Sequence, residues 1–119
     1  MIEFYDIDPN YTDFLQRYDT KVPNIRYDSN NKFVCGVVLD VNNVRYFAPV
    51  SHMTTRQRTN ILIYDQNIPI ASIRFSFMFP AVESVIRRKD FSDIALRNPD
   101  YARLLRKEYS FCIRNANNI

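Results

Sequence analysis

Apolar residues near the start of the chain predict a short strand followed by an amphipathic helix. Residues 4–7 are aromatic or aliphatic apart from one aspartate, which suits a strand. Asp8 and Pro9 then supply an acidic N-cap and a proline at the first helical position. Apolar side chains recur at the spacing of one helix face: Tyr11, Phe14, Leu15 and Tyr18. We expect this helix to end before Pro23, because residues that precede proline avoid the α-helical region.

The middle of the chain predicts a β-hairpin. Residues 33–41 and 44–50 are both apolar and rich in β-branched side chains, and Asn42-Asn43 separates them. Asparagine tolerates positive φ, so this pair can form the turn of a two-residue hairpin. The polar residues 24–31, which precede the hairpin, predict a loop.

Two further strands are expected after the hairpin, over residues 61–64 and 70–79. In the second of them, bulky apolar side chains occupy every other position: Ile73, Phe75, Phe77 and Phe79. Arg74 and Ser76 occupy positions between them, as in an antiparallel sheet with one exposed face. The polar residues 51–60 predict a loop.

The end of the chain predicts a basic connection and a last helix. Arg87-Arg88-Lys89 forms a basic cluster in what reads as a connecting segment, and Asn98-Pro99 repeats the cap-and-proline start. The residues that outline one face of the last helix are Tyr101, Leu104, Leu105, Glu108, Phe111 and Cys112. The predicted fold class is α+β, a twisted antiparallel sheet or small open barrel with helices packed on it.

Length and composition indicate one globular domain spanning residues 1–119. A chain of 119 residues with 46% hydrophobic and 24% charged residues can bury one core. Cys35 and Cys112 lie in apolar stretches without metal-binding spacing, so we expect reduced core thiols. Acidic residues interrupt the N-terminus and no apolar run has transmembrane length, so we expect a cytoplasmic protein without membrane association.

Charge divides unevenly along the chain. Residues 1–50 carry five Lys/Arg against seven Asp/Glu, whereas residues 51–119 carry eleven against six. Nine of those eleven cations are arginine, which makes bidentate contacts with phosphate and stacks on bases. This bias suits a polyanionic partner, although a solvated arginine-rich surface fits the charge equally well.

Several common catalytic machineries are absent from the sequence. A single glycine, Gly36, excludes a glycine-rich phosphate loop, and a single histidine, His52, excludes a histidine-based metal cluster. No nucleophile-elbow motif is present. A two-metal carboxylate nuclease remains formally possible without a supporting motif, and we expect neither a metal nor another cofactor.

RNA cleavage can proceed without these machineries, because the 2′-hydroxyl of RNA is an internal nucleophile. The enzyme must supply a base, an acid for the leaving oxygen, and positive charge around the phosphorane. Residue types that can do this are concentrated in one set: Tyr11, Tyr27, Lys32, Ser51, His52, Arg56 and Arg58. The alternative is that these residues are simply the polar side chains expected in any loop, and that Tyr11 is a core residue on a helix face.

Motifs spread over nearly the whole chain resemble the ToxN/AbiQ family of endoribonuclease toxins. The family's KVPN motif, its K-x-x-x-G strand and its Y-x-A-P-aliphatic-Ser/Thr strand end resemble segments 21–24, 32–36 and 46–51, in that order. Further along, segment 77–80 (FMFP) resembles the F-M-aliphatic-P segment, and the pattern from Asn98 to Arg114 resembles the family's late helix. Each motif is short, but their shared order makes chance agreement improbable.

The resemblance implies a fold, an activity and a partner. It implies a twisted sheet related to the small-barrel RNase toxins and metal-independent cleavage that leaves 2′,3′-cyclic phosphate and 5′-hydroxyl ends. It also implies type III toxin–antitoxin function, with neutralisation by a repeat-derived pseudoknot RNA antitoxin in a toxin–RNA hetero-oligomer. Some family members act in phage defence by abortive infection.

The resemblance also assigns roles to individual residues. It implies that Lys32 stabilises phosphorane charge or the leaving oxygen and that Ser51 holds a phosphate oxygen. Tyr11 and Tyr27 match aromatic positions of the family cleft. The family often has a second hydroxyl residue and then a lysine after the strand end; here His52 and Arg56 follow Ser51 instead. His52 therefore becomes a candidate acid or base.

A second group of residues is expected to contact RNA rather than to react with it: Lys21, Arg45, Arg56, Arg58, Arg74, Arg87, Arg88 and Tyr101. The same basic and aromatic residues would serve a non-catalytic RNA-binding module, which is the alternative function. Two other functions remain as alternatives. One is a toxin that is inhibited by a protein, and the other is a structural protein whose positive charge is incidental.

Overall fold

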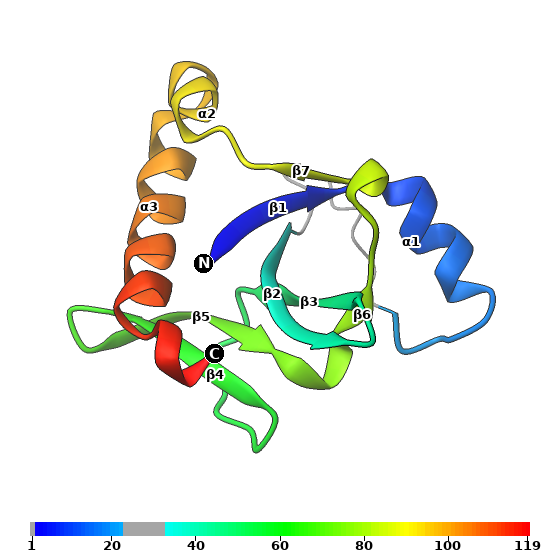
Figure 1. The fold of residues 1–119 in the computed structure, drawn as a ribbon. Helices are drawn as coiled ribbons and strands as arrows, with labels where there is room; N and C mark the ends of the chain where they lie inside the picture. Colours follow the sequence, from blue (N-terminus) through cyan, green and yellow to red (C-terminus); the bar gives the residue numbers. More distant parts are fainter. Residues whose placement is uncertain (1, 23–32) are drawn as a thin grey trace.

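A curved antiparallel sheet with helices on both faces forms the body of the protein (Figure 1). The computed structural model describes residues 2–22 and 33–119. The described strands are β1 (Glu3–Ile7), β2 (Phe33–Val41), β3 (Val44–Ser51), β4 (Asn60–Asp65), β5 (Ile68–Arg74), β6 (Phe79–Pro80) and β7 (Ile86–Arg88). Their order is β4-β5-β3-β2-β1-β7, with β6 paired to β3. The helices are α1 (Pro9–Gln16), α2 (Phe91–Arg97) and α3 (Pro99–Arg114). The predicted α+β class is confirmed.

Two asparagines form the turn of the predicted hairpin between β2 and β3. Asn42 and Asn43 have φ angles of 52° and 67°, both in the left-handed region. Such a pair matches the right-handed twist of the flanking strands. Gln66 and Asn67 repeat this geometry between β4 and β5, with φ of 51° and 67°. The first hairpin was predicted from the sequence, whereas the second was anticipated only as two separate strands.

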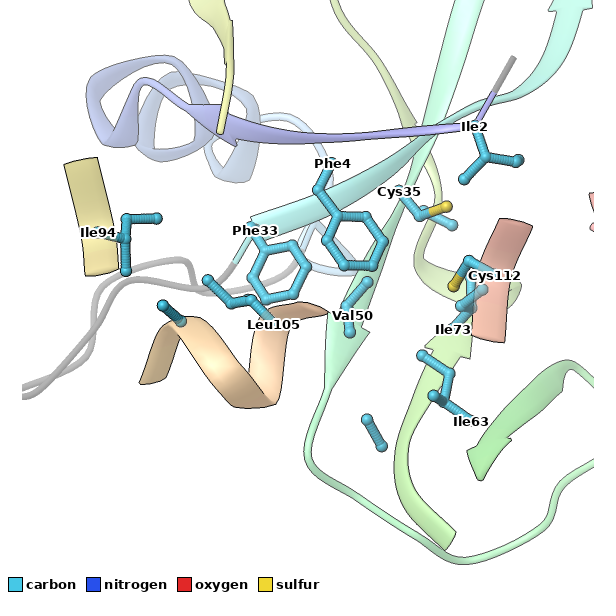
Figure 2. Close-up of a cluster of buried hydrophobic side chains, with 13 residues drawn as sticks. Ile2, Phe4, Phe33, Cys35, Val50, Ile63, Ile73, Ile94, Leu105 and Cys112 are labelled. Carbon is cyan, nitrogen blue, oxygen red and sulfur yellow. The ribbon is translucent and has the colours of Figure 1, made fainter. Parts of the chain in front are cut away.

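Alternating side chains divide the core into two clusters on opposite faces of the sheet. Phe33 and Cys35 of β2 pack beneath α3, while Val34, between them, belongs to the cluster beneath α1. Figure 2 shows the α3 side, where Leu105 lies beside Phe33 and Cys112 points toward Cys35. Both cysteines are buried free thiols, as predicted. The sheet is thus covered on both faces.

The first helix begins as predicted but is shorter than its apolar pattern. Asp8 caps it by accepting a hydrogen bond from the Asn10 amide at 2.9 Å. Of the four apolar residues on the predicted face, only Tyr11 and Leu15 pack against the core beneath α1. Because the helix ends at Gln16, Tyr18 lies beyond it and is 76% exposed, which corrects its predicted place on the buried face. Phe14 is 47% exposed and contacts the Tyr18 ring instead.

The predicted strand over residues 70–79 is wrong after Arg74. The chain bends through a 3₁₀ turn over Phe75–Phe77 and resumes as β6. The Phe75 amide donates to the Thr59 carbonyl at 2.9 Å, and the Met78 amide donates to the Phe75 carbonyl at 3.2 Å. These hydrogen bonds replace the inter-strand hydrogen bonds that a continuous strand would make. The alternation of apolar side chains in the sequence does not indicate this bend.

The basic cluster at residues 87–89 is also not a simple connection. Arg87 and Arg88 belong to β7, which pairs antiparallel with β1 and forms one edge of the sheet. Helix α2 follows it and was not predicted, because seven residues are too few to display a clear periodicity. The last helix was predicted correctly, including its Asn98 cap, which accepts from the Tyr101 amide at 3.1 Å.

Two further expectations concern loops and membranes. Residues 51–60 are mostly irregular as predicted, except that Ser51 ends β3 and Asn60 begins β4. The predicted loop over residues 24–31 lies outside the described residues. Within residues 2–22 and 33–119, the helices are too short and too polar to span a bilayer.

Candidate active site

Ser51 and His52 lie where β3 ends, beside the first residues of β2. Ser51 pairs with Ser72 of β5, and its hydroxyl accepts a hydrogen bond from the Met53 amide at 3.2 Å. That bond turns the chain away from the sheet. Val50 faces the core beneath α3, so strand alternation directs Ser51 to the opposite face. Ser51 is buried at the rim of the sheet.

The His52 side chain contacts α3 on the other face. It is 61% exposed, and its Nε2 atom lies 3.8 Å from Oε1 of Glu108. The Glu108 side chain is completely buried, and neither carboxylate oxygen has a hydrogen-bond partner among the described residues. An accessible imidazole therefore sits against a buried carboxylate at the end of β3.

Tyr101, at the start of α3, is part of the same titratable cluster. Burial raises the pKa of Tyr101 to about 12, and the negative charges of Asp6 and Glu108 act in the same direction. Its hydroxyl is therefore a hydrogen-bond donor and a poor base. Lys89 lies close to it, with Nζ 5.7 Å from the Tyr101 ring centre and 5.0 Å from that of Phe33.

Lys89 is the most buried cation of this region. Its side chain is 6% exposed, and Nζ forms an ion pair with Oδ1 of Asp6 at 2.8 Å. Both residues of the pair line a cleft of about 450 Å³. Cationic side chains around the cleft come from Arg87 and Arg88 on β7 and from Arg97 on α2. Such a cleft suits phosphate groups, and Tyr101 is also among its lining residues.

Nearby carboxylates partly neutralise the positive charge of this cleft. Arg97 pairs with Asp93 at 2.9 Å, and Arg88 lies 3.7 Å from Glu3. The arginine side chains remain more than two-thirds exposed, at 69% for Arg97 and 70% for Arg88. They are therefore accessible to a polyanion, because exposed ion pairs are weak and exchange partners readily.

The structure does not bring Tyr11 together with His52. The Tyr11 hydroxyl donates to the Pro80 carbonyl at 2.7 Å, and its ring packs in the core beneath α1, on the opposite face of the sheet. Burial raises the pKa of Tyr11. Lys32 and Tyr27, the other two predicted catalytic residues, lie outside the described residues; Lys32 directly precedes Phe33 in the sequence.

The remaining predicted RNA contacts are dispersed. Arg56 donates to the Tyr64 hydroxyl at 3.1 Å, in the segment after β3 that also carries the exposed Arg58. Arg45 lies near the hairpin turn and pairs with Glu83 at 3.4 Å, six residues, or about 20 Å of extended strand, from Ser51.

Of the other two cations, Lys21 lies away from the end of β3, whereas Arg74 follows Ile73, which pairs with Val50 beside Ser51. Lys21 lies in the turn after α1, where its amide bonds to Asp19. The Arg74 guanidinium stacks 4.3 Å from the Phe77 ring centre, and its Nε is buried without a hydrogen-bond partner in the described chain.

Sequence reasoning did not assign a functional role to Glu108, Lys89, Asp6 or Arg97. For Glu108 a signal existed: it is the one acidic residue on the apolar face of α3, between Leu105 and Cys112. The other three become neighbours only through pairing of β1 with β7 and packing of α2, neither of which was predicted. Within the described ranges, three or more potential metal ligands do not cluster anywhere.

The family model for toxin ToxN of type III toxin–antitoxin systems matches residues 3–119. The chain is 26% identical over 130 residues to an endoribonuclease ToxN of Pectobacterium atrosepticum, covering 99% of this chain and 75% of that protein. It is 23% identical over 121 residues to one of Bacillus thuringiensis subsp. kurstaki, covering 98% and 62% respectively. The chain therefore spans less than two-thirds of the second relative.

Solved structures share the fold. One, from work on selective toxin inhibition by a non-coding RNA pseudoknot in type III systems, has a TM-score of 0.91 at 22% identity, covering 98% of this chain and 72% of that one. Another is AbiQ, a lactococcal anti-phage endoribonuclease, with a TM-score of 0.78 at 21% identity, covering 94% and 72%. These similarities extend across both helix-covered faces of the sheet.

Proposed function

The chain belongs to the ToxN toxin family of type III toxin–antitoxin systems, and on that premise we propose that it is an endoribonuclease restrained by an RNA antitoxin. Two relatives are named endoribonucleases. The observation in this chain that best supports the proposal is an accessible imidazole at a strand end, backed by a buried carboxylate. A cationic cleft is lined by Tyr101, on the same helix as that carboxylate.

The proposed reaction is an internal transesterification at the phosphorus atom, followed by release of the two RNA fragments. His52 accepts the proton of a 2′-hydroxyl, whose oxygen forms a bond to the adjacent phosphorus. The bond from phosphorus to the 5′-oxygen breaks, and that oxygen takes a proton from the Lys32 ammonium. The products are a 2′,3′-cyclic phosphate and a 5′-hydroxyl. These residues require no metal to perform the proton transfers.

Several observations favour His52 as the base over the other candidates. Burial raises the pKa of both Tyr11 and Tyr101, which makes tyrosinate a rare species at neutral pH. Arginine is always protonated, which excludes Arg56. Histidine is the side chain that most often serves as a general base. Ser51 precedes His52 but faces the other side of the sheet, and it is proposed only to bind a non-bridging phosphate oxygen at the rim.

The cleft is the proposed track for the RNA backbone. Arg87, Arg88 and Arg97 would contact phosphates on either side of the reacting one, and Tyr101 would donate a hydrogen bond or stack there. Arg56 and Arg58 would extend the contact beyond β3. Arg45 and Lys21 lie elsewhere and are proposed only as contacts to the larger antitoxin. Arg74, at the end of β5 beside the end of β3, is proposed as an RNA contact there.

The proposed inhibitor is a folded RNA of the pseudoknot type, and the proposed assembly is a toxin–RNA hetero-oligomer of a single-domain protein. One structural neighbour is described as a toxin selectively inhibited by such an RNA, and AbiQ is described as anti-phage. An RNA antitoxin and an RNA substrate share the phosphate chemistry that the cleft recognises. Phage defence is the corresponding proposed role in the cell.

The test uses an RNA that the purified protein cuts at one mapped site. Replacing the nucleotide 5′ of that site with its 2′-deoxy form should abolish cutting, because the nucleophile is gone. The same replacement one nucleotide away is the matched control and should leave cutting intact. Cleavage of the deoxy substrate would contradict the mechanism. Tight binding of unmodified RNA without cleavage would favour a non-catalytic RNA-binding module.

A further inference from the structure

Glu108 occupies a position on α3 that an apolar residue would ordinarily fill. It lies between the buried residues Leu105 and Cys112 on the helix face that packs against the sheet, and its side chain is 0% exposed. Removing a carboxylate from water is costly unless hydrogen bonds or a counter-charge compensate. No hydrogen bond to either oxygen is found among the described residues. A buried charge of this kind calls for a specific partner.

The cationic residues nearest to Glu108 along α3 are directed elsewhere. Lys107 pairs with Asp65 at 3.0 Å, and the Arg106 guanidinium lies 5.8 Å from the Phe91 ring centre. The group that Glu108 does face is the imidazole of His52, at 3.8 Å. The carboxylate therefore lies behind an imidazole whose side chain is 61% exposed.

We propose that Glu108 is a positioning residue for His52. Its carboxylate holds the imidazole in one orientation and stabilises the imidazolium that forms when His52 takes the proton of the 2′-hydroxyl. Buried carboxylates act in this way on catalytic histidines in other hydrolases. Glu108 is shielded from solvent and does not touch RNA. This inference rests on the proposed function, and it identifies the residue that makes His52 an effective base.

The distance of 3.8 Å between the imidazole and the carboxylate is that of an ion pair rather than of a short hydrogen bond. Catalytic hydrogen bonds are often long without substrate and shorten when the transition state is bound. Burial raises the pKa of Tyr101, and a hydrogen bond to Cys35 together with burial raises the pKa of Cys112; the charge of Glu108 adds to both shifts. The surroundings of the carboxylate thus include two groups that stay neutral and one, His52, that can become its counter-ion.

The first test measures single-turnover cleavage and RNA affinity for Glu108→Gln, His52→Ala and the double variant. Glutamine keeps the shape of the side chain and removes its charge. We expect Glu108→Gln to cleave roughly 10- to 100-fold more slowly with unchanged RNA affinity, and His52→Ala about 100-fold or more slowly. The double variant should be no slower than His52→Ala, because Glu108 acts through His52. Glu108→Asp, which keeps the charge, should retain more activity than Glu108→Gln.

Cys112→Ala is the matched control. It changes a buried residue one turn further along the same helix face, so it should lower thermal stability while leaving the cleavage rate near that of the wild type. Glu108→Gln should keep the wild-type melting temperature or exceed it, since a buried charge is removed. If the cleavage rates of Glu108→Gln and Cys112→Ala fall in proportion to their losses of thermal stability, the positioning role is overturned.

The second test does not depend on cleavage. His52 is the only histidine, so its imidazole gives a single set of NMR signals. These signals should shift in Glu108→Gln and stay unchanged in Cys112→Ala. Unshifted signals together with a wild-type cleavage rate in Glu108→Gln would refute the proposal. If the wild-type protein leaves RNA intact, the proposed function fails, while a shift of the imidazole signals would still support the contact.

Discussion

The ring of Phe47 on β3 lies directly against the backbone of Gly36 on β2. A β-carbon placed at Gly36 would lie 2.0 Å from Cδ1 and 2.5 Å from Cε1 of Phe47. Phe47 is completely buried in the core beneath α1, so its ring has little freedom to move. Gly36 is the only glycine of the chain, and because it has no side chain, the Phe47 ring can pack directly against the backbone of β2. The contact lies three residues into the strand whose first residues adjoin the candidate site.

Gly36→Ala is predicted to destabilise the fold through this contact. Overpacking a core costs about 1–3 kcal/mol, and here the obstacle is a ring held on all sides. Denaturant unfolding should show a lower midpoint with an unchanged slope. Adding Phe47→Leu should recover part of the loss, because the smaller side chain frees the space. An alanine variant as stable as the wild type would contradict the observed packing.

The arginines of the cleft are predicted to govern the salt dependence of RNA binding. Replacing Arg87 and Arg88 with alanine should weaken affinity and make the slope of log K against log salt shallower by about 1.5, since each phosphate contact contributes about 0.7–0.9. Replacing Arg103 and Arg114, two exposed cations of α3 that do not line the cleft, is the control. An equal effect of both pairs would show that overall charge, rather than the cleft, binds RNA.

Tyr101 is predicted to make the fold sensitive to alkali. Burial and the nearby charges of Asp6 and Glu108 raise the pKa of Tyr101 from 10.0 to about 12, so the folded protein holds a proton that the unfolded chain releases. Stability from this group is therefore complete below pH 10 and is lost as pH rises toward 12.

The measurement for Tyr101 compares the free energy of unfolding of the wild type and Tyr101→Phe between pH 8 and pH 12. The wild type should lose more stability than the variant across the upper half of that range. Tyr11 and Tyr109, whose pKa values are also raised, are present in both proteins and cancel in the difference. Parallel curves would mean that Tyr101 titrates normally.

Lys32 is predicted to serve the reaction more than binding. Lys32→Ala should reduce cleavage by roughly 100-fold or more, because it removes positive charge from the phosphorane and a proton from the leaving oxygen. Affinity for a pseudoknot RNA that inhibits the wild-type protein should change little, and Lys21→Ala should leave cleavage intact. Retained cutting by Lys32→Ala would remove Lys32 from the mechanism.

Local rules allowed much of the fold to be predicted from the sequence. The Asn42-Asn43 turn and the caps at Asp8 and Asn98 depend on short-range chemistry, so they were identified correctly. The bend after Arg74 depends on a hydrogen bond between Phe75 and Thr59, sixteen positions apart, and alternation alone predicts a continuous strand there. Helix α2 was missed because its seven residues show too little periodicity.

The candidate site was less predictable for a related reason. Ser51 and His52 stand out as polar residues at the end of an apolar strand. The partner of His52 comes from α3, more than fifty positions later, and only the packing of α3 on the sheet brings Glu108 to it. The family resemblance implied a place for Tyr11 in the cleft, and that role stays a prediction; in the structure the Tyr11 hydroxyl donates to the Pro80 carbonyl.

The most direct test of ribonuclease function is incubation of the purified, antitoxin-free protein with cellular RNA in excess EDTA, followed by analysis of fragment ends. The proposed mechanism predicts fragments with 2′,3′-cyclic phosphate and 5′-hydroxyl ends, and their loss in His52→Ala. Intact RNA from protein shown to be folded, or fragments with 5′-phosphate ends, would contradict it.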